Sequence, residues 1–313
     1  MSNNNFFFQY GWCFGFGYFL FSLYWVVISL TFDSSFKFLI PLAIILLPAF
    51  LATFYGLITY LFSAFYSKNV VSSFLIFSVL FGILEFVRGF IFTGFPWNLI
   101  SFSFSKNIYF IQILSIIGTY SFNLICISLF SIPALLILRN SRMEVIVFCF
   151  FIIVSASFFI FGNIKSSNFD RLESIKNSYT IKAISPNISL DRFYTGDDEL
   201  KIINELIELS APTKKEPTLY LWPEGIIPDS HTGDMGVYKD LFMSSFGTHD
   251  LIIMGLNSIN TKNDKNLLFN SMAIFNNKLD LINVYNKINL VPFGEFIPIK
   301  NILSLVGFKT VTN

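Results

Sequence analysis

The chain has 313 residues, of which 54% are hydrophobic and 13% charged, and its formal net charge is +1 at pH 7. This apolar composition excludes a wholly water-soluble protein and predicts that a large part of the chain lies in lipid. The near-zero net charge provides no field that would attract a polyanion, so we expect no nucleic-acid partner.

Long apolar runs fill the first half of the chain. A helix that crosses a bilayer needs about 20 mainly apolar residues, and about five stretches reach this length. They lie near residues 11–31, 38–66, 70–92, 108–138 and 145–161. We therefore predict a polytopic α-helical membrane domain over residues 1–164.

Basic residues in the predicted loops indicate an orientation. Lys68, Arg139 and Arg142 fall in loops that share one side of the membrane, whereas Lys37 and Lys106 fall on the other. Because cytoplasmic loops carry an excess of Lys and Arg, we predict a cytoplasmic N-terminus. After an odd number of crossings, the second half of the chain then lies outside the cytoplasm. In a bacterium this means the inner membrane, with the second domain in the periplasm.

The composition changes near residue 164, where Lys, Asp, Glu and Asn become frequent and the apolar runs shorten. Some of these runs are typical of strands, and two longer segments have helical spacing. The strand-like runs are 179–184, 218–222, 251–256, 270–275 and 281–285, and the helix-like segments are 197–209 and 235–247. Because strands alternate with helices, we predict an α/β domain over residues 165–313.

The cysteines and histidines do not indicate a metal site. Cys13, Cys126 and Cys149 lie in apolar runs, where a thiol behaves as a small hydrophobic group. His231 and His249 have no neighbours with the spacing of metal ligands. We therefore expect no metal and no cofactor.

A glutamate stands at the end of a strand-like run, where α/β enzymes often place catalytic groups. Glu224 lies between Pro223 and Gly225 and two residues after Trp222. The flanking Trp222 and Pro223 predict partial desolvation, which would suit a general base. The alternative is a solvated loop glutamate.

A lysine follows the last strand-like run. Lys287 precedes a segment, 291–298, that contains two prolines and a glycine and would hold its shape. A lysine fixed beside such a loop can direct its ammonium at a developing oxyanion, although most lysines are exposed and solubilising. Glu295 lies within this segment, where it would support the site or be an exposed charge.

A charged pair also occurs within the third apolar run. Glu85 and Arg88 are three positions apart, so an ion pair within one helix is the simplest interpretation. The loop that follows contains Pro96 and Trp97, and Trp is common at membrane interfaces. We expect this end of the helix to contact a lipid headgroup or to anchor the protein.

Four segments in this order resemble the apolipoprotein N-acyltransferase family, whose membrane helices carry a domain of the nitrilase, or carbon-nitrogen hydrolase, superfamily. They are Trp12-Cys13-Phe14-Gly15-Phe16-Gly17 leading into Tyr24-Trp25-Val26, and the ranges 85–97, 221–228 and 285–298. The resemblance implies a polytopic helical membrane domain followed by a partial nitrilase-like α/β domain, that is, part of an αββα sandwich.

The resemblance also implies a reaction. Members of this family move an acyl chain from a phospholipid onto a cysteine and then onto the N-terminal amine of a diacylglyceryl-cysteine lipoprotein. In this scheme Glu224 is the general base, Lys287 stabilises the oxyanion and Glu295 supports the site. The candidate lipid or substrate contacts are Arg88, Pro96, Trp97 and Phe193.

The chain departs from the family pattern in three respects. The family's nucleophilic cysteine lies well beyond the lysine, whereas the last cysteine here is Cys149 and the sequence stops at Asn313. The family has further apolar segments before the first one here, and Phe193 stands where the family has tryptophan. We therefore expect a chain shortened at both ends that forms no acyl-enzyme by itself.

Three hypotheses about function stay open. The first is an acyltransferase that uses a phospholipid donor and a diacylated lipoprotein acceptor, completed by further sequence or by a separate chain that carries the missing C-terminal part. The second is a non-catalytic membrane module that binds lipid or supports assembly. The third is a nitrilase-type amidase, which the membrane half of the chain disfavours.

Overall fold

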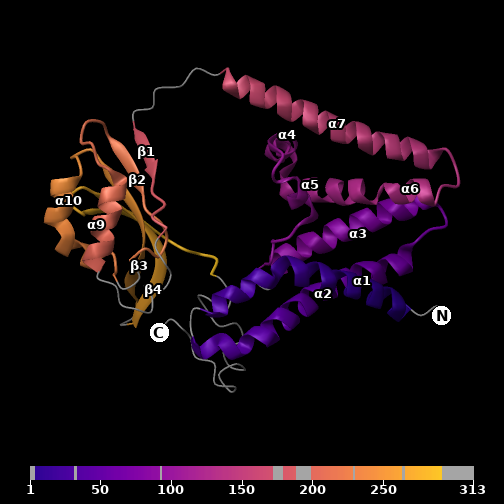
Figure 1. The fold of residues 1–313 in the computed structure, drawn as a ribbon, viewed down its shortest axis with the longest axis horizontal. Helices are drawn as coiled ribbons and strands as arrows, with labels where there is room; N and C mark the ends of the chain where they lie inside the picture. The colour runs from indigo at the N-terminus through magenta and orange to yellow at the C-terminus, as the bar shows by residue number, and fades with distance from the viewer. Residues whose placement is uncertain are drawn as a thin grey trace. The chain divides into compact units, whose positions relative to one another are not determined.

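The computed structural model describes residues 4–31, 34–91, 94–171, 179–187, 199–227, 230–262 and 265–290, whose path is drawn in Figure 1. The chain divides into two compact units, Met1–Glu173 and Ser174–Asn313. The last helix of the first unit continues to Asp170, beyond position 164, where the composition changes.

The described part of the first unit is helical. Its helices are α1 (Asn4–Leu23), η1 (Tyr24–Thr31), η2 (Ser34–Leu39), α2 (Ile40–Phe65), α3 (Val70–Phe90), η4 (Ile100–Phe104), α4 (Ile108–Ile111), α5 (Leu114–Ser131), α6 (Pro133–Ile137) and α7 (Met143–Asp170). Within the described ranges, 5 segments are long and apolar enough to cross a membrane, namely Phe6–Thr31, Lys37–Phe65, Val70–Phe90, Leu114–Ile137 and Met143–Asp170. The predicted polytopic helical membrane domain is confirmed.

The fourth predicted span differs from the structure. The run 108–138 is not one helix, because α4 ends at Ile111 and α5 begins at Leu114. Gly118 interrupts α5 with a φ of 74°, a left-handed conformation that glycine adopts without a steric penalty. Hydropathy alone does not reveal this break, since apolar residues lie on both sides of it.

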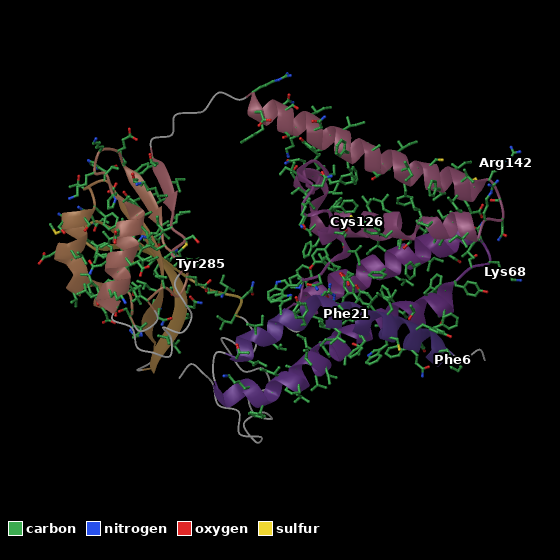
Figure 2. All side chains as sticks on the ribbon, viewed as in Figure 1. Phe6, Phe21, Lys68, Cys126, Arg142 and Tyr285 are labelled. Carbon is green, nitrogen blue, oxygen red and sulfur yellow. The ribbon has the colours of Figure 1, made fainter. Side chains whose placement is uncertain are left out.

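Helices α1 and α2 pack closely because glycines remove side chains from their contact. An ideal Cβ on Gly11 would lie 2.3 Å from the backbone oxygen of Tyr55, and one on Gly15 would lie 2.7 Å from the Cβ of Tyr55. Small residues allow membrane helices to approach in this way. Tyr55 then packs in a core with Phe19 and Phe81. Figure 2 shows Lys68 and Arg142 at the same end of this unit, as the predicted alternation of spans requires.

The second unit contains a mixed sheet of five strands in the order β1-β2-β3-β4-β5. The strands are β1 (Thr180–Ala183), β2 (Thr218–Leu221), β3 (Leu251–Lys262), β4 (Lys265–Asn276) and β5 (Leu281–Asn286), with helices α9 (Glu199–Ser210), η5 (Asp234–Tyr238) and α10 (Lys239–Ser245). The pairs β1/β2 and β2/β3 are parallel, and the pairs β3/β4 and β4/β5 are antiparallel. This is the architecture that a partial nitrilase-like α/β domain predicts.

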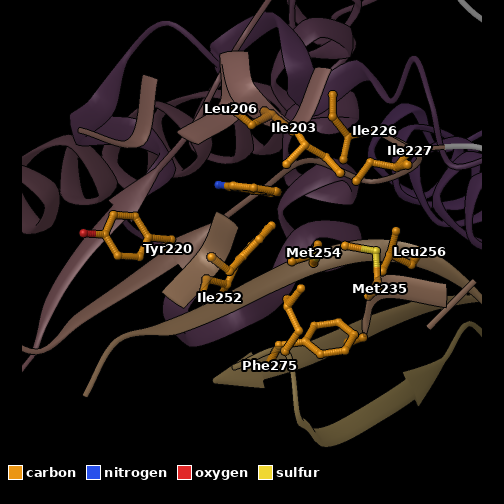
Figure 3. Packing of buried hydrophobic residues seen from close by; sticks show 14 of the residues in the cluster. Ile203, Leu206, Tyr220, Ile226, Ile227, Met235, Ile252, Met254, Leu256 and Phe275 are labelled. Atoms are coloured by element: carbon orange, nitrogen blue, oxygen red, sulfur yellow. The ribbon is translucent and has the colours of Figure 1, made fainter. Parts of the chain in front are cut away.

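One face of this sheet packs against α9 and α10 (Figure 1) and forms the core seen in Figure 3. The strands contribute alternate residues, among them Ile252, Met254 and Leu256 of β3, because successive side chains of a strand point to opposite faces. Helix α9 contributes Ile203 and Leu206. The opposite face of the sheet is therefore the one on which residues such as Ile253 and Gly255 lie.

We predict that Ile203→Ala destabilises the second unit by about 2–5 kcal/mol, because it removes a buried side chain and leaves a cavity. Ile203 is 0% exposed, whereas Leu209 on the same helix is 49% exposed. Hydrogen exchange of the β3 amides, followed by mass spectrometry, measures the opening free energy. Leu209→Ala is the matched control, and equal effects of the two substitutions would contradict the packing described here.

Candidate active site

Glu224 and Lys287, which the sequence singles out as chemically informative, are in contact. Lys287 Nζ lies 3.2 Å from Glu224 Oε1, although 63 positions separate the two residues. Glu224 follows β2, and Lys287 follows β5, just beyond Tyr285, which is labelled in Figure 2. The sheet therefore brings together a carboxylate and an ammonium that the sequence keeps far apart.

The expected desolvation of Glu224 is not found among the described residues. The Glu224 side chain is 62% exposed and that of Lys287 is 32% exposed. Trp222 does not cover the carboxylate, because it is buried in the core and its Nε1 donates to Ser210 Oγ at 2.9 Å. Glu224 is therefore exposed to solvent, and Lys287 is partly exposed.

The turn that carries Glu224 passes directly over β3. An ideal Cβ on Gly255 would lie 2.5 Å from Glu224 Cα, closer than real Cβ contacts, and 3.1 Å from the nitrogen of Gly225. Gly225 has a φ of 61°, which favours glycine, and the N–H of Trp222 donates to the oxygen of Ile253 at 2.8 Å. The two glycines let the backbone cross β3 and present Glu224 to β4.

Asn270 on β4 completes the cluster. Its Nδ2 donates to Glu224 Oε1 at 2.6 Å, the same oxygen that Lys287 contacts. Its backbone oxygen accepts the N–H of Lys287 at 2.8 Å. Asn270 is not among the residues that the sequence singles out. The available signal was a polar residue within a strand, opposite Asn257 in the register of β3 and β4, since asparagine is depleted in strands.

A second cluster of polar side chains connects the strands on the face of the sheet opposite to Glu224. Ser258 Oγ lies 2.7 Å from Ser271 Oγ, and both serines hydrogen-bond to Asn286 Oδ1, at 3.1 Å and 2.8 Å. Both serines are buried. Ser271 directly follows Asn270, and Asn286 directly precedes Lys287. This group of hydrogen bonds therefore holds Asn270 and Lys287 in register.

His231 forms a parallel bridge with Asn257 of β3, the residue opposite Asn270. His231 Nδ1 is 3.1 Å from Asp234 Oδ2, and the pKa of Asp234 is lowered chiefly by the hydrogen bond from the backbone N–H of His231. Among the residues that the structure describes, no group of three or more His, Cys, Asp or Glu is arranged to hold a metal ion. The cysteines belong to the first unit, where Cys126, labelled in Figure 2, is buried and Cys13 and Cys149 are exposed.

In the first unit, Arg88 lies at the end of α3 and is fully buried beside Glu85. Their closest atoms, Arg88 Nη2 and Glu85 Oε2, are 2.8 Å apart, so the expected ion pair within the helix is present. Arg88 Nη1 also donates to the backbone oxygens of Phe95 and Trp97, at 2.6 Å and 2.9 Å. The guanidinium carbon lies 5.3 Å from the ring centroid of Phe19. These contacts fasten the loop after α3 to the helix.

This loop presents aromatic surface. Trp97 is 47% exposed and Trp25 is 45% exposed, and their rings stack with centroids 5.3 Å apart. Pro96 is also exposed, and Tyr18 Oη donates to the backbone oxygen of Asn98 at 2.9 Å. The two remaining candidates, Phe193 and Glu295, lie outside the described residues.

Comparison with known proteins gives consistent matches. The model of the apolipoprotein N-acyltransferase N-terminal domain matches residues 2–132. The chain is 30% identical to the apolipoprotein N-acyltransferase of Rhizobium rhizogenes, 31% to that of Rickettsia typhi and 32% to that of Rickettsia prowazekii, each over 97% of this chain. It covers 58%, 60% and 60% of these relatives, so it spans about three fifths of the length of the curated relatives that it matches.

We predict that Gly255→Ala separates Glu224 from Lys287, because the added Cβ would overlap the backbone of Glu224. A carbodiimide joins a carboxylate and an amine only when they touch, so the yield of the Glu224–Lys287 crosslink, measured by peptide mass spectrometry, reports the contact. Gly233→Ala is the control, since nothing lies within 4 Å of its added Cβ. An unchanged crosslink yield in Gly255→Ala would show that the turn does not depend on this glycine.

We also predict that Arg88→Ala destabilises the membrane unit by about 3–5 kcal/mol, because it leaves the buried Glu85 carboxylate without its partner. Denaturant unfolding in bicelles measures this free energy, and Arg142→Ala, at an exposed arginine, serves as the control. Replacing both partners, as in Glu85→Gln with Arg88→Met, is expected to recover part of the loss. Equal stability of Arg88→Ala and Arg142→Ala would contradict the role of the pair.

Proposed function

The chain belongs to the apolipoprotein N-acyltransferase family, and we propose that it supplies the base and the oxyanion-stabilising lysine of an acyl-transfer site. The donor is a phospholipid and the acceptor is the N-terminal amine of a diacylated lipoprotein. The observation that carries the proposal is the contact of Lys287 Nζ with Glu224 Oε1 at 3.2 Å, which brings together the two residues that the family resemblance names.

In the proposed first step, the Glu224 carboxylate accepts the proton of a cysteine thiol, and the thiolate attacks an ester carbonyl of the phospholipid. The Lys287 ammonium stabilises the oxyanion of the tetrahedral intermediate. When the intermediate collapses, the C–O bond breaks, Glu224 returns the proton to the leaving alkoxide, and a lysophospholipid departs. The product is a thioester on the cysteine.

In the second step, the lipoprotein amine attacks the thioester carbonyl, and Glu224 accepts the amine proton. The C–S bond breaks, Glu224 returns this proton to the leaving thiolate, and an amide remains on the lipoprotein. The thiol comes from sequence other than these residues, on the same chain or on a separate one, because Cys13, Cys126 and Cys149 lie in apolar spans. Glu295 supports the site from the segment that follows Lys287.

The membrane unit suits a lipid donor. Its apolar spans and its similarity to bacterial apolipoprotein N-acyltransferases support a bacterial membrane protein, and we propose that it resides in the inner membrane with the second unit in the periplasm. The exposed Pro96 and Trp97 contact the donor near its headgroup, and Arg88 acts by holding their loop. Phe193 is proposed as a substrate contact, and the open position of Glu224 leaves room for two large substrates in turn.

We predict that Glu224→Gln and Lys287→Ala each lower acyl transfer at least about 100-fold, because each removes a group that acts in the transition state. The assay uses the intact protein, meaning these residues with whatever sequence adjoins them in the gene, and follows transfer from a phospholipid to a diacylated lipopeptide by mass spectrometry. Glu216→Gln and Lys278→Ala, at exposed positions, are the controls and should retain full activity.

Other outcomes separate the alternatives. Full activity of either site variant would remove the roles given to Glu224 and Lys287. Binding of phospholipid without any transfer would favour a non-catalytic membrane module. Release of ammonia from small amides, with phospholipid left intact, would favour an amidase.

A further inference from the structure

We propose that Asn270 is a positioning residue for this reaction, which holds the Glu224 carboxylate with its side chain and the Lys287 backbone with its carbonyl. The inference rests on the proposed function, since it concerns the same site. Neither the family resemblance nor the sequence pattern assigns Asn270 a role, and the inference comes from its contacts.

Asn270 touches both members of the proposed catalytic pair. Its Nδ2 lies 2.6 Å from Glu224 Oε1, and its backbone oxygen accepts the Lys287 N–H at 2.8 Å. Lys287 Nζ contacts the same Glu224 oxygen at 3.2 Å. The three residues thus form a closed triangle of contacts in which two donors converge on Oε1. With Oε1 held in this way, Oε2 is the oxygen that exchanges a proton with the reacting thiol or amine.

The chemistry of the contact fixes which atom of the amide faces the carboxylate. An ionised carboxylate only accepts hydrogen bonds, and an asparagine side chain has one donor group, its NH₂. The hydrogen bond therefore requires Nδ2 toward Glu224. A hydrogen bond to a charged acceptor is stronger than one between neutral groups, so the amide restrains the carboxylate more than an ordinary surface contact would.

Asn270 is the most firmly held of the three residues. It lies within β4, which pairs with β3 on one side and β5 on the other. The next residue, Ser271, is buried and bound to Ser258 and Asn286 from the opposite face. Glu224, in contrast, lies on a turn with a 62% exposed side chain. A short side chain on a fixed strand can therefore orient a longer side chain on a turn, and such orientation is worth a large part of a catalytic barrier.

The residue type supports a role beyond sheet structure. Asparagine is depleted in strands, yet Asn270 lies opposite another asparagine, Asn257, in the middle of the β3/β4 pairing. A residue type that weakens a strand is expected at positions where function requires it. A β-branched or aromatic residue would suit the strand better but would give Glu224 no donor.

The test compares Asn270→Ala with Asn270→Asp in the acyl-transfer assay of the intact protein, normalised to folded protein. Asn270→Ala is expected to lower kcat about 10-fold to 100-fold with little change in KM for the phospholipid, because Glu224 is misplaced in the transition state and not in binding. Asn283→Ala and Asn283→Asp, at an exposed asparagine of β5, are matched controls with unchanged activity.

The pH dependence of the Asn270→Asp variant distinguishes hydrogen-bond donation to Glu224 from a purely structural role. Its carboxyl group has the shape of the amide but donates a hydrogen bond only when protonated. The activity of Asn270→Asp relative to Asn270→Ala should therefore rise several-fold as the pH falls from about 8 to about 5.

Each outcome bears on a distinct claim. If Glu224→Gln is inactive while Asn270→Ala keeps a normal kcat, the proposed function stands and the role of Asn270 is overturned. If Asn270→Ala is impaired but the ratio to Asn270→Asp does not change with pH, donation to Glu224 is overturned. If Glu224→Gln remains active, the proposed function fails, and the inference about Asn270 fails with it.

Discussion

The contact between the Glu224 carboxylate and the Lys287 ammonium depends on one close approach of two backbones. Glu224 follows β2 and Lys287 follows β5, and β3 and β4 lie between these strands in the sheet. The turn after β2 spans this distance because Gly255 of β3 has no side chain where Glu224 passes. The position of Glu224 above β4, and with it the contact to Asn270, follows from this crossing.

Each unit contains a carboxylate–cation pair, but the two pairs differ in their exposure to solvent. The Glu85–Arg88 pair is almost completely buried, and the remaining donors of Arg88 go to backbone oxygens of the next loop, so its contacts are those of a structural clamp. The Glu224–Lys287 pair is exposed, and exposed pairs contribute only about 0–1 kcal/mol to stability. Stability therefore accounts for little of the second pair, which is consistent with the catalytic role that we propose for it.

The environment of Glu224 shows where local reasoning about a motif fails. The sequence places Trp222 and Pro223 beside Glu224 and predicts that they shield it, yet Trp222 belongs to the core beneath α9 and α10. Side chains two residues apart share a face only while a strand continues, and the strand ends at Leu221. The groups that do contact the carboxylate, Asn270 and Lys287, are 46 and 63 positions away.

The sequence by itself determined the membrane helices and the α/β character of the second half, and it singled out the two charged residues that meet in the candidate site. Apolar length and alternation are local properties, and Glu224 and Lys287 lie in segments that resemble a known family. The tertiary structure decided the break at Gly118, the close approach at Gly255 and the contacts of Asn270. These depend on which strands are neighbours, in which register they pair and where backbones approach, and such relations between distant segments leave no pattern in a single sequence.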